Sequence, residues 1–232
     1  MITYSGSDKW KQRATQLLNS GSGLSPFSLT GRKFIFIGDS YQEGWTEVSG
    51  STIPKIDSWL DYFISWYGSE MSGYYRNQAG GWGFAKTNCQ FITLLQNLAS
   101  SISDKTSITD IVVQGGYNDY GYVSGVIQAI SEFMTYCKAT YPNAKVWIAP
   151  LDWTINSNQS LVISAEQNYI DGGQRYGANI CNNIKWYLRN HEEYLSSDEV
   201  HPNATGYQAL ARCMHNCLCT GSCEIDYIGG AS

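Results

Sequence analysis

A serine that can act as a nucleophile lies at Ser40, directly after the apolar run "FIFIGD". Because a serine hydroxyl is a weak nucleophile at neutral pH, it needs a general base. The segment "SSDEVHPNATGY" supplies one, since Asp198 precedes His201 by three residues and can orient its imidazole. Pro202 biases His201 away from helical geometry, and Asn203 can cap the helix that begins beyond it. The pattern predicts a Ser-His-Asp triad, although a surface loop beside a capped helix has the same sequence signature.

Two further segments can stabilise the oxyanion that forms during acyl transfer. "VVQGGYND" places Asn118 just after an apolar run, where its side-chain amide can donate a hydrogen bond. "RNQAGGWGF" contains Gly81 and Gly83, whose backbone N–H groups can approach a substrate closely because no Cβ intervenes. Each segment alone also fits an ordinary turn. Together they predict an oxyanion hole, in which either glycine can take part.

These segments need a scaffold that brings them together, and the apolar pattern predicts one. Apolar runs predict strands at 33–38, 73–78, 108–116, 144–153 and 183–188. Helical spacing of apolar residues predicts helices at 56–67, 91–98, 126–137, about 160–180 and 207–218. Alternating strands and helices imply an α/β fold, with a parallel sheet, right-handed crossovers and helices on both faces.

The order of the motifs is more specific than any one of them. Gly-Asp-Ser, Asn-x-x-Gly-Gly, Gly-x-Asn-Asp and Asp-x-x-His-Pro follow one another along the chain. In this order they resemble the four landmarks of the SGNH (GDSL-type) hydrolase family, over roughly residues 32–218. The resemblance implies a flavodoxin-like, three-layer α/β/α sandwich with about five parallel strands, ester hydrolysis, and no metal or cofactor. Tyr41 departs from the family pattern, which usually has leucine after Gly-Asp-Ser.

The resemblance also implies a role for each motif residue. Ser40 is expected to be the nucleophile, His201 the base, and Asp198 the group that orients His201. The expected oxyanion donors are the N–H groups of Ser40 and Gly81 and the side chain of Asn118. The second landmark is compressed in this chain, so Gly83 stays an alternative to Gly81.

The substrate is predicted from the aromatic residues near the landmarks. These are Trp45, Trp82, Tyr117, Tyr120, Tyr122 and Trp153. Because sugar rings pack against aromatic faces, we expect a serine esterase that removes small acyl groups, such as acetyl, from a carbohydrate, with Tyr41, Trp82 and Tyr117 as substrate contacts. The alternatives are a lipase or thioesterase on the same fold and a non-catalytic carbohydrate-binding module. The polar segment 44–54, expected to form part of a pocket rim, argues against a lipid substrate.

Composition limits the possible partners. The 232-residue chain has a net charge of −5 and no basic stretch, which argues against nucleic-acid binding. No apolar run reaches transmembrane length and no signal-peptide pattern is present, so membrane insertion is not expected. The chain is expected to be cytoplasmic or a domain of a larger exported or phage protein. Residues 1–31 are predicted to form a helix, about 8–19, and a linker before the hydrolase domain at 32–232.

Four of the seven cysteines lie in "CMHNCLCTGSC" at 213–223. This run is compact and begins in a predicted helix, which is poor geometry for a structural zinc site, so no metal and no catalytic role are predicted for it. In an oxidising environment we expect a disulfide in which Cys219 or Cys223 folds back onto the helix or reaches Cys181. In a reducing compartment the cysteines are expected to stay free thiols.

Overall fold

Five parallel strands form the centre of the molecule. The structure, a computed structural model, describes residues 28–150, 153–181 and 185–220. The strands lie in the order β2-β1-β3-β4-β5, and every neighbouring pair is parallel. Their bounds are β1 Lys33–Gly38, β2 Gly73–Gln78, β3 Asp110–Gly115, β4 Lys145–Pro150 and β5 Asn179–Ile180. This is the flavodoxin-like strand order, as the sequence predicted.

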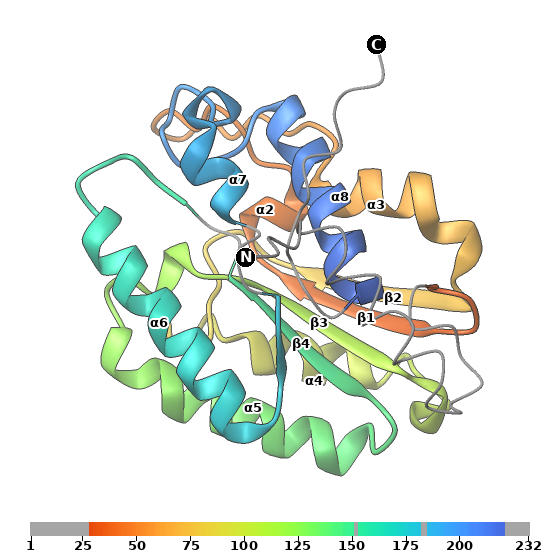
Figure 1. The fold of residues 1–232 in the computed structure, drawn as a ribbon. Helices are drawn as coiled ribbons and strands as arrows, with labels where there is room; N and C mark the ends of the chain where they lie inside the picture. The colour runs from red at the N-terminus through yellow and green to blue at the C-terminus, as the bar shows by residue number, and fades with distance from the viewer. Residues whose placement is uncertain (1–27, 151–152, 182–184, 221–232) are drawn as a thin grey trace, which may run out of the picture.

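Helices cover both faces of the sheet (Figure 1). One face carries α2 (Ser40–Glu43), α3 (Trp59–Tyr67), α7 (Lys185–Asn190) and α8 (Ala204–Thr220). The other face carries α4 (Phe91–Ala99), α5 (Val126–Thr140) and α6 (Gln159–Tyr176). Short 3-10 turns lie at Gly68–Glu70, Lys105–Ser107, Tyr117–Asp119, Val123–Gly125 and Glu192–Tyr194.

The alternation of side chains along β1 explains why its central residues, Phe34–Ile37, are all apolar. Phe34 and Phe36 belong to the core cluster shared with α3 and α8. Ile35 and Ile37 belong to the opposite cluster, shared with α4 and α5. Successive side chains of a strand point to opposite faces, so a strand covered on both sides needs an apolar residue at every position.

One predicted strand is wrong. The fifth strand is Asn179–Ile180 rather than 183–188, and α7 covers most of the stretch predicted as strand. A short apolar run such as "NIKWYL" fits a buried helix turn as well as a strand, and periodicity cannot separate the two. The predicted helix at 8–19 lies outside the described residues, as does most of the linker.

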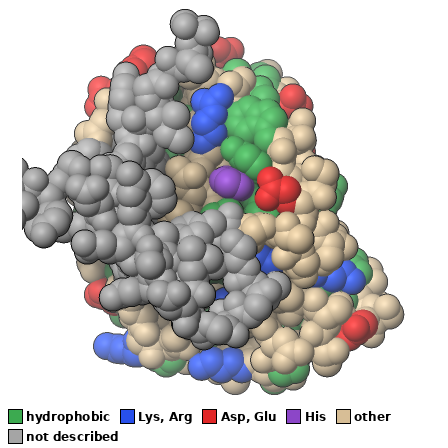
Figure 2. All heavy atoms as spheres, turned by 45° about the vertical axis from the view of Figure 1, so that its right-hand side comes forward, with side chains coloured by type: hydrophobic (Ala, Val, Ile, Leu, Met, Phe, Trp, Pro, Cys, Tyr) green, Lys and Arg blue, Asp and Glu red, His purple; other side chains and the backbone are tan. Residues whose placement is uncertain are grey.

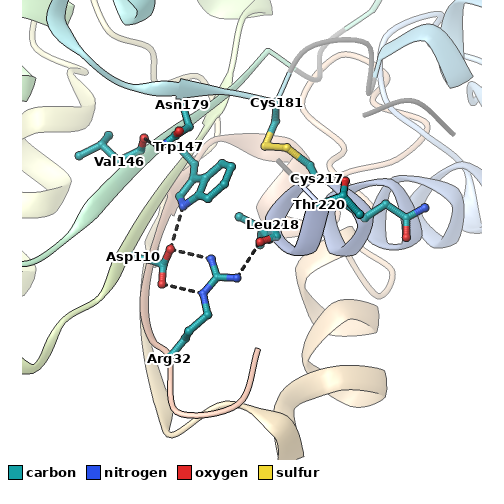
Figure 3. The surroundings of a disulfide bond; sticks show 10 residues. Arg32, Asp110, Val146, Trp147, Asn179, Cys181, Cys217, Leu218 and Thr220 are labelled. Carbon is teal, nitrogen blue, oxygen red and sulfur yellow. Dashed lines mark hydrogen bonds and ion pairs between the residues drawn. A yellow bond between two sulfur atoms is a disulfide. The ribbon is translucent and has the colours of Figure 1, made fainter. Parts of the chain in front are cut away.

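A disulfide joins the sheet to the last helix (Figure 3). It links Cys181, which follows β5, to Cys217 of α8, with 5.8 Å between the Cα atoms. The prediction named Cys181 correctly but chose the wrong partner, because Cys217 and not Cys219 faces β5; Cys223 lies outside the described residues. The guanidinium of Arg32 adds a second tie, since it pairs with the Asp110 carboxylate and donates to the carbonyl of Leu218 near the end of α8.

The outer surface of α3 and α8 carries one exposed aromatic side chain and several half-buried ones. Trp66 of α3 is exposed and lies under the guanidinium of Arg212 of α8. His215 of α8 stacks on Tyr67 with 3.9 Å between the ring centroids. Figure 2, which brings this side of the molecule forward, shows a hydrophobic patch beside a histidine and a basic side chain.

No helix among the described residues has the length and apolar character needed to cross a membrane.

Candidate active site

The candidate site lies at the carboxyl edge of the sheet, where three neighbouring strands end. Ser40 follows β1, the loop with Gly81 follows β2, and Asn118 follows β3. Because β1 lies between β2 and β3 in the sheet, these three segments meet at one place. The connection that leaves β1 runs to β2 on one side, and the connection that leaves β3 runs to β4 on the other side. The point between β1 and β3 is therefore a switch point, which is where open α/β sheets hold their ligands.

The Gly-Asp-Ser turn is explained by close packing. A Cβ on Gly38 would lie 2.6 Å from the side-chain amide of Gln42 and 2.9 Å from that of Gln114, so a larger residue would require these buried amides to move. Asp39 caps α2, because its Oδ1 accepts from the N–H of Tyr41 at 3.1 Å. Ser40 is therefore fixed as the first residue of α2, with 6% of its surface exposed.

A continuous hydrogen-bonded chain connects the three predicted triad residues. Ser40 Oγ lies 2.9 Å from His201 Nε2. His201 Nδ1 lies 2.7 Å from Asp198 Oδ2. Because Nδ1–H donates a hydrogen bond to the carboxylate, Nε2 carries no proton and can accept a hydrogen bond from the serine hydroxyl. The structure thus brings together the three residues in the arrangement that activates a serine.

The carboxylate of Asp198 is held in its ionised form. Burial alone raises the pKa of Asp198, but the hydrogen bonds from the His201 ring and from the N–H groups of His201 and Val200 outweigh this effect and hold the pKa well below its ordinary value. The two N–H groups lie 2.8 and 2.9 Å from Asp198 Oδ1. At neutral pH Asp198 is therefore only an acceptor, which is the state that a carboxylate needs in order to stabilise a protonated imidazole.

The histidine turn is anchored at both ends. The carbonyl of His201 accepts from the N–H of Ser196 at 2.7 Å. As predicted, Asn203 caps α8, since its side chain accepts from the N–H of Gly206 at 3.1 Å. The hydroxyl of Tyr41 donates to the carbonyl of Val200 and ties α2 to this turn.

This role of Tyr41 corrects its assignment as a substrate contact. Its side chain is fully buried, and its hydroxyl also accepts from the N–H of Trp153 at 3.3 Å. A buried ring offers no face to a substrate, so Tyr41 supports the histidine turn from behind. The sequence signal was misleading because Tyr41 is adjacent to Ser40, and the first turn of α2 directs consecutive side chains in different directions.

The backbone favours Gly81 over Gly83 as an oxyanion donor. The N–H of Gly83 already donates to the carbonyl of Cys89 at 3.0 Å. A Cβ on Gly83 would lie 2.5 Å from the Asp119 carboxylate, so this glycine serves packing. Gly81 has a φ of +81°, and within the described ranges its N–H, like that of Ser40, has no hydrogen-bond acceptor. These two N–H groups remain available for a substrate oxygen.

Asn118 lies where the sequence placed it, but its amide is engaged. Nδ2 donates to the carbonyl of Trp82 at 3.0 Å and to Asp39 Oδ2 at 3.2 Å. Asp39 also accepts from Gln114 Nε2 at 2.8 Å, which fixes the carboxylate behind Ser40. Both N–H groups of the amide are thus occupied, and one has to turn away from its acceptor before it can reach an oxyanion.

The two other predicted substrate contacts are partly exposed. Trp82 lies in the loop after β2 and packs against the core that faces α4 and α5. The hydroxyl of Tyr117 accepts from the side-chain amides of Asn156 at 3.3 Å and Asn158 at 3.2 Å. Trp45 lies beside the predicted triad, with 5.8 Å between the centroids of its ring and that of His201. The sequence had marked Trp45 only as one of six nearby aromatic residues.

Trp45 packs tightly against the loop with Gly81. A Cβ on Gly80 would lie 2.0 Å from the Trp45 indole, so only glycine fits there. The N–H of Gly80 donates to Glu43 Oε2 at 2.6 Å, which ties the same loop to the end of α2. The indole therefore packs against both the His201 ring and the loop with Gly81.

Comparisons with known proteins agree with the fold. No protein-family model and no curated protein matches the sequence. Among solved structures, a GDSL-like lipase from Parabacteroides merdae matches with a TM-score of 0.59 and 14% identity, covering 83% of this chain and 96% of that one. A carbohydrate acetylesterase from Sinorhizobium meliloti matches with a TM-score of 0.56 and 15% identity, covering 80% and 97%. An acetylxylan esterase from Geobacillus stearothermophilus matches with a TM-score of 0.58 and 12% identity, covering 88% and 100%. The chain has the fold of the SGNH hydrolases, as its sequence motifs predicted.

Proposed function

We propose that this protein is a serine esterase that uses Ser40, His201 and Asp198 as its triad. The observation that carries the proposal is the unbroken chain of short hydrogen bonds from Ser40 Oγ through the imidazole to the Asp198 carboxylate. This hydrogen-bonded chain lies at the carboxyl edge of the sheet, next to the Ser40 and Gly81 N–H groups, for which the described part of the structure offers no acceptor. This combination supplies a nucleophile, a base, an orienting carboxylate and oxyanion donors in one place.

The proposed reaction proceeds through an acyl-enzyme. His201 Nε2 takes the proton of Ser40 Oγ as the oxygen attacks the ester carbonyl carbon, and the carbonyl oxygen becomes an oxyanion. When this intermediate collapses, His201 gives the proton to the leaving alcohol, and the acyl group stays on Ser40. Water then enters, loses a proton to His201 and releases the acid, which restores the free serine.

The oxyanion donors are assigned to the N–H groups of Ser40 and Gly81 and to Asn118. The first two need no rearrangement, because they donate to no acceptor among the described residues. Asn118 contributes when its N–H turns from Asp39 toward the oxyanion. Its bond to Asp39 is the longer of its two, 3.2 Å against 3.0 Å to Trp82, so this is the N–H that is released more easily.

We infer that the substrate is a small acyl ester, most simply an acetyl group on a carbohydrate. Two structural neighbours are named as a carbohydrate acetylesterase and an acetylxylan esterase. We expect the Trp45 indole, which packs against Gly80 beside His201, to favour a short acyl chain over a long one. The partly exposed rings of Trp82 and Tyr117 and the exposed ring of Tyr122 offer faces for a sugar.

The substrate class is tested with p-nitrophenyl esters of increasing chain length and with acetylated xylo-oligosaccharides. We expect kcat/KM to be highest for acetate and to fall with each longer acyl chain, and acetate to be released from the oligosaccharide. Ser40→Ala should abolish both activities and leave the fold unchanged. A preference for octanoate would indicate a lipase or thioesterase. Sugar binding without turnover would indicate a non-catalytic module and would contradict the proposal.

A further inference from the structure

The loop at 44–54 forms an irregular hairpin between α2 and α3. Its base is closed by an antiparallel bridge between Trp45 and Lys55. A hydrogen bond of 3.1 Å from the N–H of Thr46 to the carbonyl of Pro54 adds to this closure. The sequence predicted that this polar loop is a pocket rim. The structure shows that its backbone also contacts the triad carboxylate.

Two consecutive N–H groups of the loop reach the segment that carries Asp198. The N–H of Val48 donates to Asp198 Oδ2 at 2.9 Å. The N–H of Glu47 donates to Ser196 Oγ at 3.0 Å, and Ser196 Oγ in turn donates to Asp198 Oδ1 at 3.0 Å. Both oxygens of the carboxylate are therefore held from the loop, one directly and one through Ser196.

The backbone adopts an uncommon conformation to make these contacts. Glu47 has a φ of +48°, and Glu199, the residue after Asp198, has a φ of +61°. Among the described residues, Asn88 is the one other non-glycine residue in this left-handed region. Glu199 follows Asp198 in the chain, and Glu47 precedes Val48, whose N–H contacts the Asp198 carboxylate. Such strain persists where the surrounding contacts enforce it, and it gathers at functional sites. The Glu47 side chain itself is exposed, so the loop acts through its backbone.

We propose that the 44–54 loop is a positioning element of the triad, in which the Val48 N–H and the Ser196 hydroxyl hold the Asp198 carboxylate with Oδ2 facing His201 Nδ1. Neither residue touches the reacting atoms, and both act through Asp198. The inference rests on the proposed function because it concerns the same triad. It goes beyond that function by assigning a role to a loop and a serine outside the motifs.

The contact has a consequence for proton transfer. Asp198 Oδ2 is shared between the Val48 N–H and the His201 ring. Without the Val48 N–H, the carboxylate attracts the protonated imidazole more strongly, so the imidazolium persists to higher pH. The three donors on Oδ1 keep the carboxylate next to His201, but Oδ2 then has only the His201 ring to fix its direction. Removal of the loop donor should therefore move the acid limb of the pH–kcat/KM profile to higher pH.

Other titratable groups near the pair do not account for such a shift. The phenols of Tyr41 and Tyr207 each donate to a backbone carbonyl. The carboxylates of Glu47 and Glu199 are exposed and screened by water. Asp39 is buried behind Ser40 and bonded to the amides of other residues. All of these groups are unchanged by the substitutions below.

The sharpest test replaces Val48 in the full chain by its α-hydroxy acid, which turns the peptide N–H into an ester oxygen and keeps the side chain. The same replacement at Ser51, at the exposed tip of the loop, is the matched control. Ser196→Ala removes the second link, and Ser196→Thr restores a hydroxyl. Two readouts are needed: the pH profile of kcat/KM on p-nitrophenyl acetate, and the pH dependence of the His201 ring-proton resonances without substrate.

We expect the Val48 replacement and Ser196→Ala to move both readouts to higher pH by about half to one unit. This is below the roughly one to two units that a hydrogen bond made directly to the titrating group would give, because these donors act on His201 through Asp198. The Ser51 control should leave both readouts unchanged, and Ser196→Thr should restore the parent profile. Unchanged profiles for the Val48 and Ser196→Ala proteins would overturn the proposal, as would a shift to lower pH. If the parent chain hydrolyses no ester, the proposed function fails, while the ring-proton titration still decides the role of the loop.

Discussion

Replacement of Asp198 by asparagine tests the triad through the proton on the histidine. Asp198 Oδ1 accepts from the Ser196 hydroxyl and from the N–H groups of Val200 and His201, whereas Oδ2 accepts from the Val48 N–H and the His201 ring. An asparagine has a single carbonyl oxygen, and it places this oxygen where three donors converge. Its NH₂ group then faces the imidazole. Because two donors cannot pair, His201 has to adopt the tautomer in which Nδ1 accepts and Nε2 carries the proton.

In that tautomer His201 cannot take the proton of Ser40. The loss of the correct tautomer in a Ser-His-Asp hydrolase lowers kcat by about 10⁴-fold, which corresponds to about 5.4 kcal/mol on the barrier. We expect Asp198→Asn to show this loss in kcat on p-nitrophenyl acetate, with a much smaller change in KM, because no substrate contact is removed.

The control for this experiment is Asp104→Asn. Asp104 caps the 3-10 turn at Lys105–Ser107 and is not in contact with the triad, so this variant should keep the parent kcat. Circular dichroism should show that both variants are folded. A folded Asp198→Asn protein whose kcat lies within tenfold of the parent would refute the assignment of Asp198 as the group that sets the histidine tautomer.

Three further predictions concern the oxyanion hole, the disulfide and acid stability. Asn118→Ala should lower kcat by roughly 10²- to 10³-fold with a smaller effect on KM in steady-state assays, and a pure KM effect would contradict its oxyanion role. The Cys181→Ala/Cys217→Ala double variant should lose about 4 kcal/mol of unfolding free energy in urea titrations, because the bond spans 36 residues, while kcat stays at the parent value; a parallel loss of kcat would contradict this separation. Because the pKa of Asp198 is lowered in the folded state, its stabilising contribution is present above its ordinary value of 3.8 and is lost as the pH falls below that value. Urea titrations at pH 6, 4 and 3 should therefore show a shallower loss of stability for Asp198→Asn than for the parent, and equal slopes would contradict the assignment.

The motifs predicted which residues meet at the site because each motif has a local physical cause. Gly38 is favoured by the close packing of Gln42 and Gln114, and Ser40 follows as the first residue of a capped helix. The spacing of Asp198 and His201 places the carboxylate next to the ring within a single turn. Short-range relations of this kind leave a signature in side-chain types, which is why the sequence was sufficient for the triad geometry.

Contacts between distant segments were not predictable in the same way. The donation from the Val48 N–H to Asp198 uses a backbone group, which every residue except proline carries, so no residue type marks it. The burial of Tyr41 and the pairing of Cys181 with Cys217 depend on how α2 and α8 pack on the sheet. The preference for Gly81 over Gly83 in the proposed oxyanion hole rests on the Gly83 N–H being already engaged, and this engagement is visible only in the folded chain.

The central claim is that Ser40 is the nucleophile, and active-site labelling tests it most directly. The parent protein is incubated with a fluorophosphonate, which reacts with an activated serine and is not turned over, and the product is analysed by intact mass and peptide mapping. We predict one label per chain, located on Ser40, with loss of p-nitrophenyl acetate hydrolysis in proportion to labelling and no label on Ser40→Ala. A protein that continues to hydrolyse the ester while Ser40 is fully labelled, or that carries the inactivating label on another residue, would contradict the account.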